Sequence, residues 1–237
     1  MKSILVTGAS SGIGHATAKA FLEAGWQVGL VARRADRLEE LAQRYKTAIA
    51  LPGDVTDPDK MDQVFAAFTA QAGRLDVLFN NAGLFGPSSV PDEVSVADFD
   101  EVMAVNIRGM FIAARAAFAQ MRAQIPQGGR IINNGSISAH VPRERSICYT
   151  TSKHAVTGMT RALSLDGRDY DIACGQIDIG NAESELVAGI KAEYPGLPTM
   201  DVADAAKSIL HMASLPLEAN VQFITVMATK MPYIGRG

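Results

Sequence analysis

Tyr149 and Lys153 are two side chains whose types and spacing could carry out acid–base chemistry. They are four residues apart, so on a helix they lie on one face, one turn apart. A tyrosine hydroxyl ordinarily ionises at about pH 10 and is a poor acid or base at neutral pH. An adjacent ammonium group favours the phenolate, and its other N–H groups can hold hydroxyls of a bound ligand. Such pairs are also common on helix surfaces, so this one indicates catalysis only together with other signals.

A glycine-rich segment near the N-terminus supplies a second signal. The first apolar run leads into Thr7–Gly14 (TGASSGIG), where a helical pattern begins. Glycines allow a tight turn and a close approach to phosphate, and a helix N-terminus supplies unpaired N–H groups. The spacing G-x-x-x-G-x-G differs from the commoner G-x-G-x-x-G, but its place between a strand and a helix favours a dinucleotide site over a plain turn. The candidate cofactor contacts here are Gly8, Ser10, Ser11, Gly12, Ile13 and Gly14.

The end of the second expected strand indicates which dinucleotide is preferred. An NAD site carries an acidic residue about 20 residues after the glycines, where it binds the adenosine ribose. Here that turn reads Val31-Ala32-Arg33-Arg34, with two guanidinium groups and no acid. Arginine binds phosphate through paired N–H groups, so Arg33 and Arg34 favour NADP(H), with its 2′-phosphate, over NAD(H). The alternative is that both arginines are solvated charges at a helix start.

Short β-branched runs alternate with long amphipathic stretches along the chain. This alternation predicts an α/β fold, a Rossmann-like, doubly wound parallel sheet of about seven strands with helices on both faces. The length suits one dinucleotide-binding and catalytic domain over residues 1–237. We interpret the looser region around residues 180–199 as a flap over the substrate; the alternative is an ordinary surface connection. The expected strands are Ser3–Thr7, Gln27–Ala32, Ala48–Leu51, Leu75–Phe79, Arg130–Gly135, Ile172–Ile177 and Gln222–Val226, and the expected helices are Ile13–Ala24, Ala35–Arg44, Pro58–Ala72, Val96–Gln124, Ile147–Tyr170 and Val202–Ser214.

Composition argues against several other classes of protein. The net charge is −3 and the basic residues are scattered, so no nucleic-acid partner is expected. The longest apolar stretch, Val102–Met121, contains an asparagine and two arginines, so we interpret it as a buried helix and expect no membrane partner. Cys148 and Cys174 lack metal-ligand spacing, so no metal site is expected. Two free thiols and an N-terminal apolar run too short for a secretion signal predict a cytoplasmic protein.

Several separated motifs, in order along nearly the whole chain, resemble those of the short-chain dehydrogenase/reductase family. The T-G-x-x-x-G-I-G loop is intact, Asn80–Gly83 is similar to the family's N-N-A-G element, and Tyr149–Lys153 matches Y-x-x-x-K. Gly53–Val55 resembles the family's turn that meets the adenine. Asn106 lies in a Val-Asn pair on the long helix, and Ser136 comes directly after the fifth expected strand, as in the family.

The resemblance implies an oxidoreductase that moves a hydride between a nicotinamide cofactor and a small carbonyl or secondary alcohol. In this group Tyr149 is the general acid–base, Ser136 orients the substrate oxygen, and Asn106 holds a water that links Lys153 to solvent. The resemblance also implies a homo-oligomer, a tetramer or dimer, built through the long helices that begin near residues 96 and 147. The resemblance adds further cofactor contacts to those of the glycine-rich loop and the two arginines. They are Asp54, Val55, Asn81, Ala82, Gly83, Tyr149, Lys153, Ile179, Gly180 and Ser184.

Some positions depart from the family pattern, mainly on the substrate side. Ile179-Gly180 stands where the family has Pro-Gly, and Ser184 stands where a threonine often contacts the nicotinamide, although serine keeps the hydroxyl. Ala173-Cys174-Gly175 replaces Arg-Val-Asn, and the ending Met227–Gly237 is also different. The substrate and the physiological direction stay open, and a non-catalytic NADPH-binding regulatory module is the second hypothesis. We interpret His140 as a loop residue rather than a substrate contact.

Overall fold

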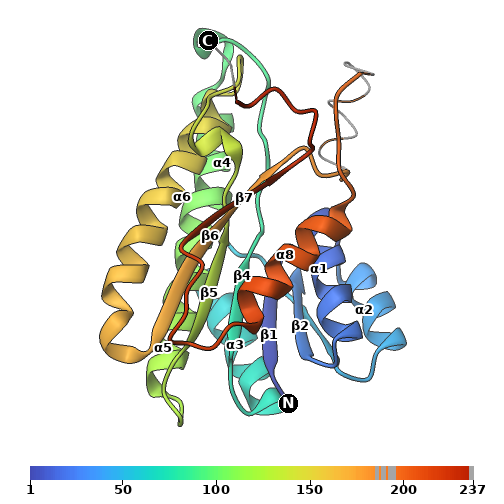
Figure 1. Cartoon of the computed structure of the whole chain (residues 1–237), viewed down its shortest axis with the longest axis vertical. Coiled ribbons are helices and arrows are strands. Elements are labelled where there is room, and N and C mark those ends of the chain that lie inside the picture. Colours follow the sequence, from blue (N-terminus) through green and yellow to red (C-terminus); the bar gives the residue numbers. More distant parts are fainter. Residues whose placement is uncertain (185–186, 188–190, 192–195, 235–237) are drawn as a thin grey trace.

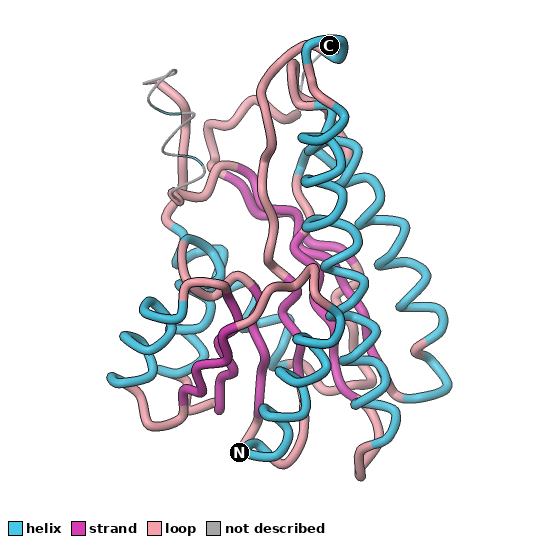
Figure 2. The backbone as a smooth tube through the Cα atoms, turned by 180° about the vertical axis from the view of Figure 1, so that it is seen from behind, coloured by secondary structure: helices cyan, strands magenta, loops and turns pink. Residues whose placement is uncertain are grey.

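The computed structural model describes residues 1–184, 187, 191 and 196–234 of the chain. Its strands form one parallel sheet in the order β3-β2-β1-β4-β5-β6-β7, with helices on both faces (Figures 1 and 2), which confirms the doubly wound fold. The strands are β1 (Ser3–Thr7), β2 (Gln27–Ala32), β3 (Ala48–Pro52), β4 (Val77–Asn80), β5 (Gly129–Asn134), β6 (Ile172–Gly180) and β7 (Phe223–Met227). The helices are α1 (Gly12–Glu23), α2 (Ala35–Arg44), α3 (Pro58–Ala72), α4 (Val96–Met103), α5 (Met110–Ala123), α6 (Ile147–Asp166) and α8 (Val202–Ser214), with short turns η1 (Pro91–Glu93), η2 (Ala104–Gly109), η3 (Ile137–Ala139) and η4 (Arg168–Tyr170).

Each face of the sheet has its own hydrophobic core. On one face, α1, α2 and α8 bury Phe21, Leu38 and Ile209 against the strands. On the other face, α3 and α5 bury Phe68 and Met121. Because helices cover both faces, the strands are apolar on both sides, and this is why they appear in the sequence as continuous apolar runs.

The strand order reverses between β1 and β4, and the carboxyl ends of the two strands meet there. A crevice for a ligand opens at such a point in doubly wound sheets. The hydroxyl of Thr7, at the end of β1, accepts hydrogen bonds from the backbone N–H groups of Asn81 at 2.8 Å and Ala82 at 3.0 Å. The glycine-rich loop after β1 and the N-N-A-G segment after β4 are therefore held side by side.

Several element bounds differ from the sequence-based expectation: α6 ends at Asp166 rather than Tyr170, β4 begins at Val77 rather than Leu75, and two further differences lie near the site. Strand β6 continues to Gly180, three residues beyond the expected end, and Ile179 pairs in register with Val226 of β7. A proline lacks the N–H group that a sheet ladder uses, so isoleucine in its place allows the longer strand. The helix expected over Val96–Gln124 is divided into α4 and α5 by the π-helical turn η2. Such turns insert one extra residue and occur frequently at functional sites.

The helical stretch Val96–Ala123 is long and apolar enough to cross a membrane by length and composition alone. In the fold, α5 buries Ile112, Ala113 and Ala117 against the sheet, next to α3. This packing is the arrangement of a core helix, in agreement with the interpretation of the apolar run as a buried segment.

The segment expected to be a flap, around residues 180–199, lies partly outside the described residues, which omit 185–186, 188–190 and 192–195. The two ends of the segment are joined. Ala182 forms a β-bridge with Met200, and the Glu183 N–H group donates to the Met200 carbonyl oxygen at 2.8 Å. The Lys191 ammonium, 3.0 Å from the Glu183 carboxylate, holds the pKa of Glu183 below its usual range. The base of the segment is therefore closed.

Candidate active site

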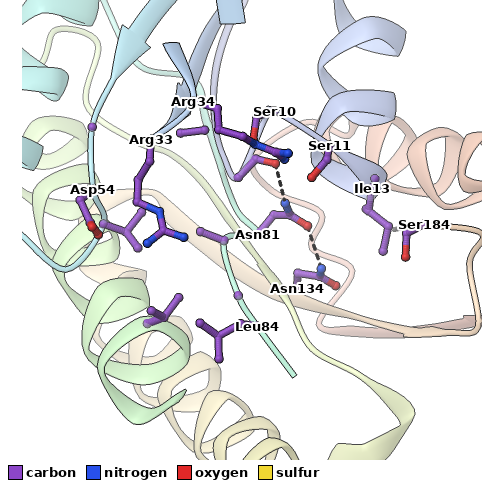
Figure 3. Close-up of a pocket in the computed structure, with 18 of the residues that line it drawn as sticks. Ser10, Ser11, Ile13, Arg33, Arg34, Asp54, Asn81, Leu84, Asn134 and Ser184 are labelled. Carbon is purple, nitrogen blue, oxygen red and sulfur yellow. Dashed lines mark hydrogen bonds between the residues drawn. The ribbon is translucent and has the colours of Figure 1, made fainter. Parts of the chain in front are cut away.

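A cleft of about 490 Å³ opens at the carboxyl edge of the sheet (Figure 3). Its walls come from the segments that follow β1, β2, β3 and β4, from the end of β5 and from α6. A cavity of this size accommodates a cofactor-sized ligand. Most of the expected cofactor contacts line it, namely Gly8, Ser10, Ser11, Gly12, Ile13, Arg33, Arg34, Asp54, Val55, Asn81, Ala82, Gly83, Tyr149, Lys153 and Ser184.

The loop between β1 and α1 has the geometry of a phosphate site. Gly8 and Gly12 adopt left-handed backbone conformations, with φ angles of 68° and 51°. A Cβ atom at Gly14 would lie 2.2 Å from the Gly8 carbonyl oxygen, so a side chain at this position would force the loop away from the helix. Ser11, the N-cap of α1, makes no side-chain capping bond, so the N–H groups of the first turn can bind an anion. The loop therefore fits the pyrophosphate of a dinucleotide.

Two guanidinium groups lie at the end of the cleft next to β2 (Figure 3). Nε and Nη2 of Arg34 donate to Oγ of Ser10 at 3.2 and 3.1 Å, so Arg34 lies beside the phosphate loop. The backbone N–H of Thr56 holds the pKa of Asp54 below its usual range, and the charge of Arg33 adds to this effect. Two cations and one ionised carboxylate thus surround this end of the cleft, and their net charge is positive.

Tyr149 and Lys153 lie one turn apart on α6, as their spacing predicts. The Lys153 Nζ atom is 5.4 Å from the centroid of the Tyr149 ring. Lys153 is only 4% exposed, and it donates to the carbonyl oxygen of Asn134 at 2.7 Å. Among the residues that the structure describes, Lys153 forms no ion pair. With one N–H group engaged by Asn134, two of the three donors of Lys153 remain for a ligand.

Asn134, at the end of β5, is a site residue that the sequence motifs did not identify. The Thr7 carbonyl oxygen accepts from Nδ2 of Asn81 at 3.0 Å. Oδ1 of Asn81 accepts in turn from Nδ2 of Asn134 at 2.9 Å (Figure 3). A carbonyl oxygen can only accept, so this order of bonds sets the orientation of both amides. It leaves Oδ1 of Asn134 as a buried acceptor with no partner among the described residues. The polar pair Asn133-Asn134 at a strand end was the available signal.

Ser136 follows β5 and caps η3. Its Oγ atom accepts a hydrogen bond from the Ser138 N–H group at 3.1 Å, and its own N–H group donates to Oδ1 of Asp178 at 2.9 Å. With one lone pair of Oγ engaged, the hydroxyl hydrogen can donate to another oxygen.

Asn106 is buried in the π-helical turn η2 and holds two other segments in place. Its Nδ2 donates to the Leu84 carbonyl oxygen at 2.8 Å and to Oγ of Ser152 at 3.0 Å, and its Oδ1 accepts from the Leu84 N–H at 2.8 Å. Both amide hydrogens are therefore engaged. The side chain connects η2 to α6 and to the loop after β4. Because both amide hydrogens are used, a water molecule at Asn106 would have to donate to the remaining lone pair of Oδ1 or to a backbone carbonyl oxygen.

A second pocket, of about 60 Å³, adjoins the cleft and contains Ser136. Phe85 forms one apolar wall and packs on Tyr149 with ring centroids 4.7 Å apart. Arg143 also lines the pocket, and its guanidinium donates to Oδ1 of Asn181 at 2.8 Å. The cleft and the pocket meet at the residues that line both of them, which are Ile13, Asn134, Tyr149 and Ser184.

The other expected residues lie around these two cavities. Ser136 and Ile179 line the smaller pocket, and Asn106 is buried behind Leu84. Gly180 lines neither cavity and packs against the end of β7, where a Cβ atom would lie 2.8 Å from Cβ of Met227. The pocket also contains residues that no motif marked, namely Phe85, Gly135, Arg143, Asn181, Ala182 and Val187.

Comparison with known sequences assigns this constellation to a family. The family model described as short chain dehydrogenase matches residues 2–195. The 2-(R)-hydroxypropyl-CoM dehydrogenase of Xanthobacter autotrophicus is 38% identical over 189 residues, which cover 77% of this chain and 75% of the relative. The sulfoacetaldehyde reductase 2 of Chromohalobacter salexigens is 31% identical over 242 residues, which cover 97% of this chain and 95% of the relative.

Solved structures agree with this fold. The 3-ketoacyl-(acyl-carrier-protein) reductase of Brucella melitensis, complexed with NADH, superposes with a TM-score of 0.90 at 25% identity and covers 96% of this chain and 97% of its own. The closed form of a serine dehydrogenase, complexed with NADP+, superposes with a TM-score of 0.89 at 24% identity and covers 94% of each chain. These two neighbours carry different dinucleotides.

Proposed function

Because this chain belongs to the short-chain dehydrogenase family, we propose that it is an NADP(H)-dependent oxidoreductase that interconverts a small carbonyl compound and a secondary alcohol. The observation that carries the proposal is the position of Tyr149, which lines both the large cleft and the smaller pocket. Lys153 lies on the cleft side of Tyr149 and Ser136 on the pocket side. A substrate oxygen in the pocket would meet both hydroxyl groups.

The chain's own residues supply binding, orientation and proton transfer. The nicotinamide cofactor, when bound, supplies or accepts the hydride. Tyr149 donates a proton to the substrate oxygen during reduction, and Lys153, one turn away on α6, places a positive charge beside this proton transfer. Ser136 donates a hydrogen bond to the same oxygen and orients it. The two other donors of Lys153 can hold ribose hydroxyls, and the unpartnered Oδ1 of Asn134 is an acceptor at the same junction.

The test of this function combines binding with turnover. Purified protein is titrated with NADPH and with NADH, and binding is followed by nicotinamide fluorescence. Aldehydes and ketones of a panel are then added, and oxidation of the cofactor is followed by the loss of its nicotinamide absorbance. Binding of NADPH with turnover of a panel member supports the proposal. Binding without turnover across the panel favours the non-catalytic regulatory module, and failure to bind either dinucleotide contradicts both.

Arg33 and Arg34 are expected to set the preference for NADPH. A charge-assisted bond to phosphate contributes about 1.5–3 kcal/mol, so Arg33→Ala and Arg34→Ala should each raise the Kd of NADPH by roughly 10- to 100-fold. NADH lacks the 2′-phosphate, so its Kd should change little. Arg37→Ala, at an exposed position of helix α2, which begins directly after Arg34, is the matched control. Wild-type protein that binds NADH as tightly as NADPH would contradict the assignment.

The substrate pocket guides the choice of compounds for the panel. Its volume of about 60 Å³ favours small carbonyl compounds, and its walls combine apolar side chains with the guanidinium of Arg143. Carbonyl compounds with and without a carboxylate or sulfonate group should therefore be compared. Two relatives, a sulfoacetaldehyde reductase and a serine 3-dehydrogenase, have names that specify substrates with such acidic groups. We propose that the segment around residues 180–199 acts as a flap over this pocket.

We propose that the protein forms a homo-oligomer through α4, α5 and α6. These helices expose large apolar side chains, among them Val96 at 76%, Phe111 at 52% and Ile147 at 40%. Association through these helices would remove this apolar surface from water. Phe111→Glu should therefore shift the protein to a smaller species in light scattering at equal concentration, whereas Leu217→Glu, at an exposed apolar residue outside these helices, should not. An unchanged mass for the Phe111→Glu variant would place the interface elsewhere.

We propose a cytoplasmic location, which the cysteines support. Cys148 and Cys174 are both free and buried. Burial raises the pKa of the Cys148 thiol and raises that of Cys174 to about 12, so both thiols are unreactive at neutral pH. Free thiols of this kind are typical of a reducing compartment.

A further inference from the structure

A buried carboxylate lies directly beneath Ser136. Asp178, on β6, is 1% exposed, although its neighbours along the strand are isoleucines. Its Oδ1 atom accepts from the Ser136 backbone N–H at 2.9 Å and from Nε2 of Gln176 at 2.7 Å. Its Oδ2 atom lies 2.7 Å from Nε2 of His140. Two of the three partners are the residues at the two ends of η3, Ser136 and His140, and the third, Gln176, lies on β6 itself.

Both oxygens of Asp178 have partners. Oδ1 accepts from two N–H groups, and Oδ2 lies within hydrogen-bond distance of Nε2 of His140. The His140 side chain is 38% exposed, so it connects the buried carboxyl group to the surface. A buried polar group needs such partners, because removal of one of them leaves the other unsatisfied.

The backbone at Gly135 shows how closely the carboxylate is fitted to this loop. A Cβ atom at Gly135 would lie 2.1 Å from Oδ1 of Asp178 and 2.6 Å from Nε2 of Gln176. Any other residue would push the chain away from the carboxylate and carry Ser136 with it. The absence of a side chain at Gly135 therefore allows the Ser136 N–H to reach Asp178.

We propose that Asp178, supported by His140, is a positioning residue that fixes the direction of the Ser136 hydroxyl. This inference rests on the proposed function, since it assigns a role through Ser136. The backbone of Ser136 is held by Asp178, and its Oγ accepts from the Ser138 N–H. With both atoms fixed, the hydroxyl hydrogen stays directed toward the pocket that contains Tyr149.

The kinetic test uses a double-mutant cycle between Asp178 and Ser136, measured with a panel substrate and NADPH. Loss of a hydrogen bond to a charged group changes an equilibrium or a rate by about 10- to 100-fold. Asp178→Ala should therefore lower kcat by this factor, while the Kd of NADPH should stay within about twofold of the wild-type value. Asp178→Asn keeps an acceptor for the Ser136 N–H and should stay within about fivefold of wild type. In the Ser136→Ala background, Asp178→Ala should lower kcat by less than about threefold, because the hydroxyl that Asp178 positions is already absent. The same loss in both backgrounds would show a general structural role and overturn the inference.

His140 provides a milder variant in case Asp178→Ala does not fold. His140→Ala keeps the carboxylate and removes one donor, so kcat should fall between the values of wild type and Asp178→Ala. His140→Gln can still donate through its amide and should recover most of the loss. Equal kcat values for all three proteins would contradict the role of His140.

A measurement without turnover separates this inference from the proposed function. Hydrogen exchange of the Ser136 amide should be slow in wild type, faster in Asp178→Ala and slow again in Asp178→Asn, because the bond to Oδ1 protects it. If the panel gives no turnover but this pattern appears, the proposed function fails while Asp178 still holds the serine. If turnover occurs and the Ser136 amide exchanges equally in all three proteins, the inference fails alone.

Discussion

Tyr149→Phe is expected to lower turnover by about 10²- to 10⁴-fold, the factor that a positioned acid–base group contributes. The substitution removes one hydroxyl and keeps the ring, so the packing of Phe85 at 4.7 Å between centroids is retained. The phosphate loop and the arginine pair are unchanged in this variant. The Kd of NADPH should therefore rise only by the small factor that corresponds to one lost contact with the ribose. The rate of NADPH oxidation at a saturating concentration of substrate measures the loss of turnover.

The matched control is Tyr170→Phe, which removes the same hydroxyl at a tyrosine that packs against Phe118 outside the cleft. It should turn over like wild type. Retained turnover in Tyr149→Phe would remove Tyr149 from its proposed role, although not the chain from its family. A loss of NADPH binding together with turnover would indicate instead that the hydroxyl serves mainly to hold the cofactor.

Arg130→Met is expected to lower the free energy of unfolding by about 3–5 kcal/mol, the effect of breaking a buried charged network. Arg130, on β5, is 2% exposed, and burial lowers the pKa of its guanidinium. It donates to Oδ1 of Asn220 at 2.8 Å and to the carbonyl oxygens of Pro216 and Ala219 at 3.0 and 2.9 Å. These carbonyls follow the C-terminal end of α8, where the helix dipole favours a cation. Methionine fills much of the volume but leaves these acceptors buried without a donor.

Urea denaturation at fixed protein concentration measures this loss. The control is Arg44→Met, since Arg44 forms an exposed pair with Glu40 and should cost at most about 1 kcal/mol. Arg130→Lys keeps the charge but cannot form the same fork of bonds, so its stability should lie between the two. Equal stability of the Arg130→Met and Arg44→Met variants would show that the buried network contributes nothing to folding.

The fold was predictable because its signals are local. Each strand is an apolar run and each helix an amphipathic one, so their alternation indicated the doubly wound sheet before any contact was known. The cofactor loop was predictable for a related reason. Gly8, Gly12 and Gly14 are required because side chains at these positions would clash with nearby atoms or strain the backbone of the loop. Tyr149 and Lys153 lie on one face of a single helix.

The π-helical turn at η2 could not be read in the same way. Its residues Ala104–Gly109 continue an ordinary helical pattern, and only the contacts of Asn106 with Leu84 and Ser152 distinguish it. The end of β6 is a similar case, because its extension to Gly180 depends on pairing with β7. Local pattern places an element approximately, and neighbouring elements decide where it ends.

By itself, the sequence determined the fold class, the phosphate loop and the Tyr149–Lys153 pair. The tertiary structure decided which distant groups support them. Ser136 and His140 meet Asp178 across 42 and 38 residues of chain, and the amides of Asn81 and Asn134 meet across 53. These partners are set by the order and register of the strands, because parallel β4, β5 and β6 bring their carboxyl ends to one edge. Neither order nor register leaves a periodic trace in the sequence, so only the assembled sheet reveals them.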